Sequence, residues 1–156
     1  LEGGTGSLSE SVYQPEIMPD RLESGTQNIP AIAGLGQAAK FLLDTGLDNI
    51  RHQEDMLCAY FEERVRAMPG ITVYGSDNKT AICALNINGA DCVTVAQQLN
   101  DRYDIAVRAG LHCAILAHKT LGTEKIGCVR FSFGFFNTIQ EVDKAVNAVY
   151  ELSKEQ

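Results

Sequence analysis

The sequence predicts an α+β domain in which helices pack on a small, mostly antiparallel sheet. Three observations carry this prediction. The expected elements follow the order helix, two strands, helix, strand, strand, helix. The first two strands are joined by a short polar loop, which is typical of antiparallel neighbours. The apolar residues switch between helical and strand spacing along the chain. A layered α+β arrangement accounts for all three.

The first long helical stretch begins at Pro30, whose fixed φ suits a first helical turn, with Asn28 as the N-cap. Apolar residues then recur at helical spacing until Thr45-Gly46 interrupts the pattern. A second helical stretch continues to Pro69-Gly70, a pair that ends helices. We therefore expect two successive helices.

The remaining elements are shorter. The last helix has the strongest signal, because Thr138 and Glu141 have the spacing of a capping box. Residues 109–127 show little periodicity and are expected to form a loop. The expected strands cover 71–74, 80–88, 105–108 and 128–133, and the expected helices cover 91–103 and 138–152.

The first 29 residues differ from the rest of the chain. They are rich in Gly, Ser, Pro and acidic residues and have no sustained periodicity. A long structureless stretch is uncommon in a complete domain. We therefore expect 1–29 to be an extended arm or connector whose packing partner is missing, and 30–156 to form the domain proper.

Composition narrows the classes of function. The net charge of −7, with only 13 Lys and Arg, argues against a nucleic-acid or anionic-membrane surface. No apolar run has the length of a transmembrane helix, and the first residues lack the features of a signal peptide. The five cysteines form no CxxC pair, which favours reduced thiols in the cytoplasm over a disulfide framework or zinc site.

The segment Arg108-Ala109-Gly110-Leu111-His112-Cys113 is the most informative. A thiol becomes a nucleophile when a nearby base or positive charge favours the thiolate. His112 is adjacent to Cys113, and Arg108 is able to bind a carboxylate through two N–H groups. The alternative interpretation of Cys113 is a small core residue.

Arg130 lies in the middle of an expected strand, on the face opposite Val129 and Phe131. An arginine in an apolar strand needs a partner that offsets its desolvation. A structural ion pair and a bound substrate carboxylate both satisfy this need, and the residues alone leave the two open.

Two other patterns are weaker. Residues 34–39 match the dinucleotide pattern G-x-G-x-x-A, but no buried strand precedes them, so close helix packing is the better interpretation. His112, Cys113 and His118 offer metal-ligating atoms, but no fourth ligand has the usual zinc spacing, and we expect no metal.

Four segments in order resemble class V aminotransferase-fold enzymes, specifically the branch of cysteine desulfurases and selenocysteine lyases. The matching segments are 23–28 (ESGTQN), 108–114 (RAGLHCA), 129–132 (VRFS) and 136–143 (FNTIQEVD). Their order and spacing fit over nearly the whole chain. The resemblance implies that 30–156 is the small C-terminal domain of a fold type I pyridoxal-phosphate (PLP) enzyme.

The resemblance also implies how the cofactor is held. Gly25 and Thr26 match the segment that reaches the PLP phosphate of the other subunit in a homodimer. The family's Schiff-base lysine lies upstream of the matching segments, so we expect this chain to be a fragment that is inactive alone. Lys119 follows a histidine, as that lysine does in many PLP enzymes, but it is expected to be a solvated residue of the Cys113 loop.

The implied reaction converts L-cysteine to L-alanine and leaves a persulfide on Cys113. The persulfide sulfur is then transferred to a sulfur-acceptor protein. Cys113 and His112 match the catalytic segment, and Arg130 and Arg108 match the positions that bind the substrate carboxylate. The alternatives are another class V PLP enzyme, either an aminotransferase or a selenocysteine lyase, and a non-catalytic interaction module. Cys113 favours sulfur or selenium transfer, because transamination needs no thiol.

Overall fold

The computed structural model describes residues 6–75 and 80–155. The polar loop expected to join the first two strands, residues 75–78, therefore lies outside the described residues except for Gly75. The chain divides into two compact units, Leu1–Gly46 and Leu47–Gln156. Within the described ranges, none of the helices is both long and apolar enough to cross a membrane.

The first unit contains a short 3-10 helix, η1 (Asp20–Leu22), and the long helix α1 (Ile29–Thr45). The Asn28 side chain accepts a hydrogen bond from the Ala31 N–H at 3.1 Å, which confirms the predicted cap. At Gly46 the backbone turns to φ 84°, a conformation that favours glycine, and α1 ends. No described residue of α1 is buried.

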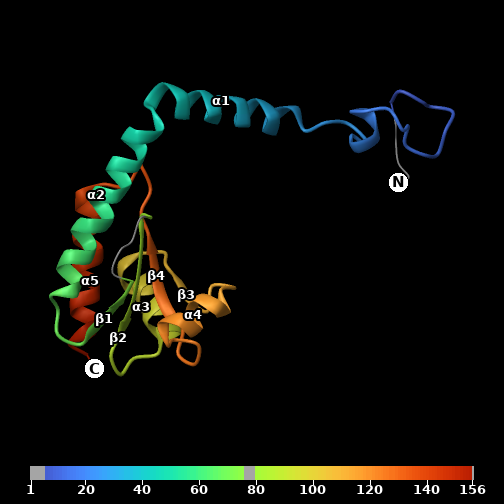
Figure 1. The fold of residues 1–156 in the computed structure, drawn as a ribbon. Coiled ribbons are helices and arrows are strands. Elements are labelled where there is room, and N and C mark those ends of the chain that lie inside the picture. The colour runs from blue at the N-terminus through green and yellow to red at the C-terminus, as the bar shows by residue number, and fades with distance from the viewer. Residues whose placement is uncertain (1–5, 76–79, 156) are drawn as a thin grey trace. The chain divides into compact units, whose positions relative to one another are not determined.

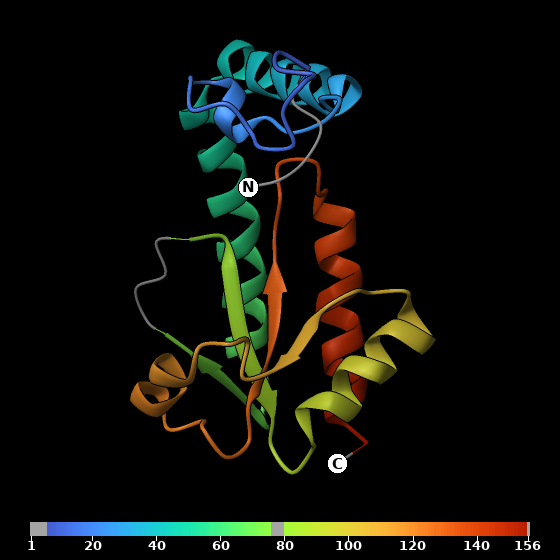
Figure 2. The ribbon, with the colours of Figure 1, turned by 90° about the vertical axis from the view of Figure 1, so that its right-hand side faces the viewer.

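The second unit is built on a sheet of four strands (Figures 1 and 2). The strands are β1 (Ile71–Tyr74), β2 (Ile82–Ile87), β3 (Arg108–Gly110) and β4 (Cys128–Ser132). They lie in the order β1-β2-β4-β3, and every neighbouring pair is antiparallel. The α+β prediction is therefore confirmed.

Three helices of this unit contribute to the core together with β2 and β4: α2 (Leu47–Arg66), α3 (Cys92–Tyr103) and α5 (Ile139–Ser153). α2 and α5 lie side by side (Figure 1). Phe61 of α2 is fully buried, and its ring lies 4.7 Å from that of Phe131 and 5.3 Å from that of Phe133.

Strand periodicity divides β2 and β4 into two sets of residues. Leu85 pairs with Val129 and Cys83 with Phe131, and all four side chains belong to the core. The residues between them, Ala84 and Arg130, also pair with each other. Since successive side chains point to opposite faces of a sheet, Arg130 lies on the face away from this core.

Two helices of this unit, α3 and α5, begin with side-chain caps. Asp91 accepts a hydrogen bond from the Thr94 N–H at 2.9 Å at the start of α3. Thr138 and Glu141 form a complete capping box at the start of α5, as predicted. The two helices therefore begin at positions fixed by local hydrogen bonds.

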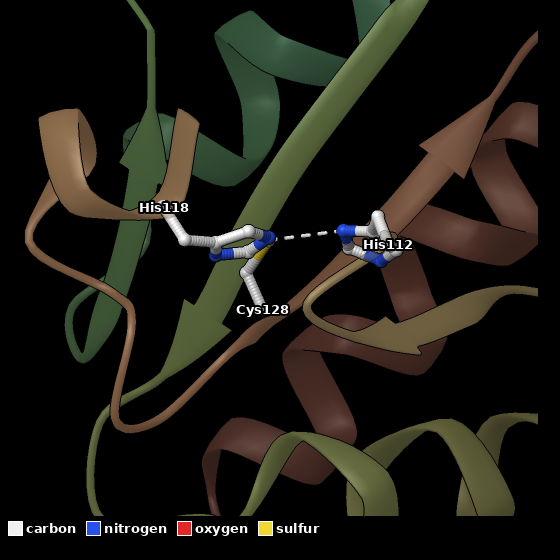
Figure 3. Close-up of side chains that lie close together, drawn as sticks. All are labelled: His112, His118 and Cys128. Atoms are coloured by element: carbon white, nitrogen blue, oxygen red, sulfur yellow. Dashed lines mark hydrogen bonds between the residues drawn. The ribbon is translucent and has the colours of Figure 1, made fainter. Parts of the chain in front are cut away.

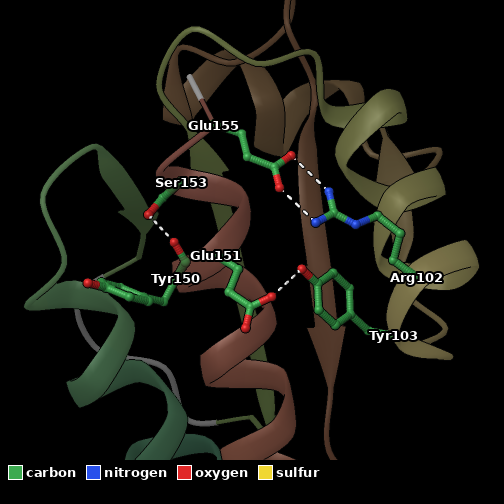
Figure 4. A network of polar contacts seen from close by, with 6 residues as sticks. All are labelled: Arg102, Tyr103, Tyr150, Glu151, Ser153 and Glu155. Atoms are coloured by element: carbon green, nitrogen blue, oxygen red, sulfur yellow. Dashed lines mark hydrogen bonds and ion pairs between the residues drawn. The ribbon is translucent and has the colours of Figure 1, made fainter.

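Polar contacts join the end of α3 to the C-terminal end of the second unit (Figure 4). Arg102 donates two hydrogen bonds to Glu155, at 2.8 and 2.7 Å, and the Tyr103 hydroxyl donates to Glu151 at 2.7 Å. These groups are exposed, so solvent screens their attraction, and they orient the helices more than they stabilise the fold.

Two expectations about residues 105–127 are wrong. The strand expected at 105–108 is β3 at Arg108–Gly110, because the Ile105 N–H instead closes the end of α3 on the Leu99 carbonyl. The region expected to be a loop contains a helix, α4 (Ile115–Leu121). α4 has seven residues and buries only His118 among them, which leaves too little apolar periodicity to detect.

Candidate functional site

Two glycines position the loop that connects β3 to β4. Gly110 pairs with Cys128, and a Cβ atom on Gly127 would lie 2.9 Å from the Cα of Gly110. Both glycines also have a positive φ, 97° and 64°, which side chains disfavour. The ends of the two strands approach this closely because neither residue has a side chain.

Cys113 lies in this loop and is exposed to solvent. His112 and Cys113 both adopt left-handed backbone conformations, with φ of 55° and 57°. Such a conformation costs a residue other than glycine about 1–2 kcal/mol, and strain of this kind gathers at functional sites. The Nη2 atom of Arg108 donates to the Cys113 Sγ at 3.6 Å, which places a guanidinium beside the thiol.

His112 does not contact the thiol that follows it. Its Nε2 lies 3.1 Å from the Arg108 carbonyl oxygen, and its Nδ1 lies 3.9 Å from the Cys128 Sγ. Burial lowers the pKa of His112 below its ordinary value, and the positive charges of Arg130 and Arg108 add to this effect. The ring is therefore neutral at pH 7, and it holds the loop in place by hydrogen bonding.

Arg108 and Arg130 are direct partners across β3 and β4. Like charges in this position repel each other. The Nε of Arg130 is buried without a hydrogen-bond partner, and no carboxylate of the described residues forms an ion pair with either arginine. Among the described residues, Arg130 therefore does not form the structural ion pair that was one of its two interpretations. Two adjacent guanidiniums with an unused donor fit an anionic ligand such as a carboxylate.

Gly25 and Thr26 belong to the first unit, shortly before α1, and both are exposed. Gly25 has φ 77°, which favours glycine. Lys119 is exposed on α4, whereas the preceding His118 is buried. The exposure of Lys119 agrees with the expectation that this lysine is a solvated residue.

A second cluster, which sequence patterns did not reveal, lies beneath the Cys113 loop (Figure 3). His118 is only 3% exposed, and its Nδ1 lies 2.7 Å from the Thr123 hydroxyl oxygen. The ligating atoms of His112, His118 and Cys128 all lie within 4.8 Å of one another. Cys128, not Cys113, therefore joins the two histidines. The alternation along β4 carries a signal for this, because it puts Cys128 on the same face as Arg130.

Alkylation with iodoacetamide near neutral pH is expected to modify Cys113 first. Cys113 is exposed, whereas burial raises the pKa of Cys58 to about 11 and that of Cys83 to about 12. Since the thiolate is the reactive form, both buried thiols are protected by protonation as well as by burial. Peptide mass spectrometry over a time course checks the order, and modification of Cys58 or Cys83 at the rate of Cys113 would contradict it.

The fold and the site together define a class: an α+β domain that presents an exposed thiol on a strained loop beside two adjacent arginines. Residues 1–145 match the model of the aminotransferase class-V family. The chain belongs to this family.

Named relatives narrow the similarity further. The chain is 34% identical to a probable cysteine desulfurase 1 of Mycobacterium leprae, over 95% of this chain and 24% of that protein. It is also 34% identical to a cysteine desulfurase of Escherichia coli (strain K12 / DH10B), over 98% of this chain and 38% of that protein. The chain therefore spans 24% to 38% of the length of these relatives.

Solved structures agree with the sequence relatives. The apo cysteine desulfurase of Thermococcus onnurineus NA1 superposes with a TM-score of 0.80 at 29% identity, covering 100% of this chain and 39% of that one. The cysteine desulfurase CsdA of Escherichia coli gives a TM-score of 0.78 at 27% identity, covering 99% and 38%. These similarities extend over both units of the chain.

Proposed function

We propose that this chain is the C-terminal part of a PLP-dependent cysteine desulfurase, in which Cys113 accepts sulfur from L-cysteine. The observation that carries the proposal is the exposed Cys113 thiol, held on a strained loop with the Arg108 guanidinium 3.6 Å from its sulfur. The relatives and solved structures that are named cysteine desulfurases support it.

In this proposal, Cys113 and the two arginines, Arg108 and Arg130, have different roles. Arg130 and Arg108 bind the substrate carboxylate and thereby orient the amino acid. The Cys113 sulfur attacks the substrate sulfur, so that an S–S bond forms as the substrate C–S bond breaks. The carbon that loses sulfur takes up a proton, and L-alanine leaves. Bound PLP supplies the electron sink that this cleavage requires. His112 assists by holding the loop through the Arg108 carbonyl.

In our proposal, most of the residues that bind PLP lie outside this chain. Gly25 and Thr26 contribute backbone and hydroxyl donors to the PLP phosphate of the partner subunit in a homodimer. The exposed position of Gly25 and Thr26 is compatible with such a contact. The exposed Lys119 supports a Schiff-base lysine located elsewhere in the protein.

The remaining assignments follow from the same proposal. The persulfide on Cys113 passes to a sulfur-acceptor protein, which the exposure of Cys113 permits. All five cysteines are free thiols, which supports a reducing, cytoplasmic location. The boundary between an arm at 1–29 and a small domain at 30–156 stays a prediction. The two compact units of the structure divide after Gly46, and none of residues 20–46 is buried.

The proposal is tested with the full-length protein that contains this chain and its Cys113→Ser variant. L-cysteine and PLP are supplied, and sulfide released by dithiothreitol is measured together with L-alanine. We expect the wild-type protein to release both and to show one added sulfur atom on the Cys113 peptide by mass spectrometry. The variant should lose the added sulfur and most of the sulfide. Equal activity of the two proteins, or no activity in either, would refute the assignment of Cys113.

A further inference from the structure

We propose that His112, His118 and Cys128 form a binding site for one zinc-type divalent ion beneath the Cys113 loop. The three residues come from three segments: the loop after β3, α4 and the first position of β4. Their ligating atoms lie within 4.8 Å of one another, and Figure 3 shows both imidazole rings next to the Cys128 side chain.

The spacing is close to what the ion needs. With Zn–N bonds of about 2.0–2.1 Å and a Zn–S bond of about 2.3 Å, tetrahedral ligands lie about 3.3–3.6 Å apart. The Nδ1 of His112 is 3.9 Å from the Cys128 Sγ, so this pair has to shorten by only a few tenths of an ångström. The longest separation, at most 4.8 Å, has to shorten by at most about 1.5 Å. A water completes the fourth position.

The second ring nitrogen of each histidine already has a partner. The Nε2 of His112 lies at hydrogen-bond distance from the Arg108 carbonyl oxygen. Because a carbonyl oxygen only accepts hydrogen bonds, Nε2 carries the proton, and the lone pair of Nδ1 points to the cluster. His118 uses Nδ1 on the Thr123 hydroxyl, which leaves Nε2 free. Metal-binding histidines are held in the same way by hydrogen bonds from the nitrogen that does not ligate.

The donor set selects the kind of ion. Two imidazoles and a thiol suit zinc and similar transition metals, whereas magnesium and calcium require oxygen ligands. The guanidiniums of Arg108 and Arg130 oppose a dication, and the loss of the thiol proton from Cys128 on binding offsets one positive charge. Burial of His118 and Cys128 limits competition by water.

Occupancy would also affect the neighbouring thiol. His112 directly precedes Cys113, so an ion bound to His112 fixes the loop in its strained conformation and restricts movement of Cys113. This consequence rests on the proposed function, whereas the binding site itself does not. Under that function, we expect zinc at saturating concentration to inhibit sulfide release, and removal of the ion by a chelator to restore it.

The test measures binding and needs no activity. The full-length protein, freed of metal, is titrated with zinc by calorimetry and in competition with a chromogenic chelator. We expect one ion per chain, with the dissociation constant raised at least about 100-fold in His118→Gln and in Cys128→Ser. Thr123→Val, which removes only the hydroxyl beside His118, should weaken binding about tenfold. Circular dichroism and thermal unfolding establish that each variant is folded.

His52→Gln and Cys113→Ser are the matched controls. His52 is the only other histidine in the sequence and is exposed on α2, and Cys113 is the exposed thiol that lies closest in sequence to His112. Neither substitution should change the dissociation constant. The proposal is overturned if zinc does not bind at micromolar concentration, if His118→Gln and Cys128→Ser bind as the wild type does, or if Cys113→Ser abolishes binding.

Discussion

Replacing Arg130 with glutamine is expected to lower kcat/KM for L-cysteine about 10- to 140-fold, while the folded state becomes no less stable. Hydrogen bonds to a charged group contribute about 1.5–3 kcal/mol, and each 1.4 kcal/mol corresponds to about a factor of ten. Arg130 has a buried Nε without a partner and faces Arg108 across β4 and β3. Its removal therefore relieves a repulsion in the free protein and costs binding only when a carboxylate is present.

Kinetics of sulfide release in the full-length protein measure kcat/KM. Hydrogen exchange of the β2 and β4 amides measures the stability of the folded state. Arg102→Gln is the matched control, because Arg102 is a surface arginine paired with Glu155. That control should leave kcat/KM unchanged. If Arg130→Gln instead lowers exchange protection by a factor as large as the loss in kcat/KM, Arg130 has a structural role. The assignment of Arg130 to binding the substrate carboxylate then fails.

Replacing Phe61 with alanine is expected to destabilise the second unit by about 3–5 kcal/mol. Phe61 is fully buried and packs against Phe131 and Phe133, so the substitution removes a large apolar side chain and leaves a cavity between α2 and the sheet. Phe131 lies directly beside Arg130 in β4, so we also expect the paired arginines to lose rigidity.

Hydrogen exchange of the core amides in the full-length protein measures this loss. Phe136→Ala is the control, because the Phe136 side chain is 80% exposed and its removal should change protection by less than about 0.5 kcal/mol. Equal effects of the two substitutions would show that the packing around Phe61 does not limit the stability of this unit.

The elements predicted correctly from the sequence are those with a local physical cause. Asn28 and Pro30 fix the start of α1, and the Thr138–Glu141 capping box fixes the start of α5. In β4, the alternation of core and polar residues shows directly in the burial of Val129 and Phe131. Each of these signals spans only a few residues and needs no knowledge of the rest of the chain.

The features that escaped prediction depend on contacts between separate segments. The Ile105 N–H closes the end of α3 on the Leu99 carbonyl, so this residue is not part of a strand and β3 begins only at Arg108. α4 is held by the burial of one histidine, which no periodicity reveals. For the same reason the partner of His112 was misplaced: Cys113 is adjacent in sequence, but Cys128 is adjacent in space.

The division of β4 between two faces has a consequence for protein engineering. Positions 129 and 131 belong to the core, whereas 128 and 130 face the loop and the arginine pair. A library that varies only 108 and 130, and leaves the buried Cys128 unchanged, would therefore alter the charge presented on this face without repacking the apolar layer beneath. Selection for a new amino-acid substrate could then proceed with little loss of yield from misfolding.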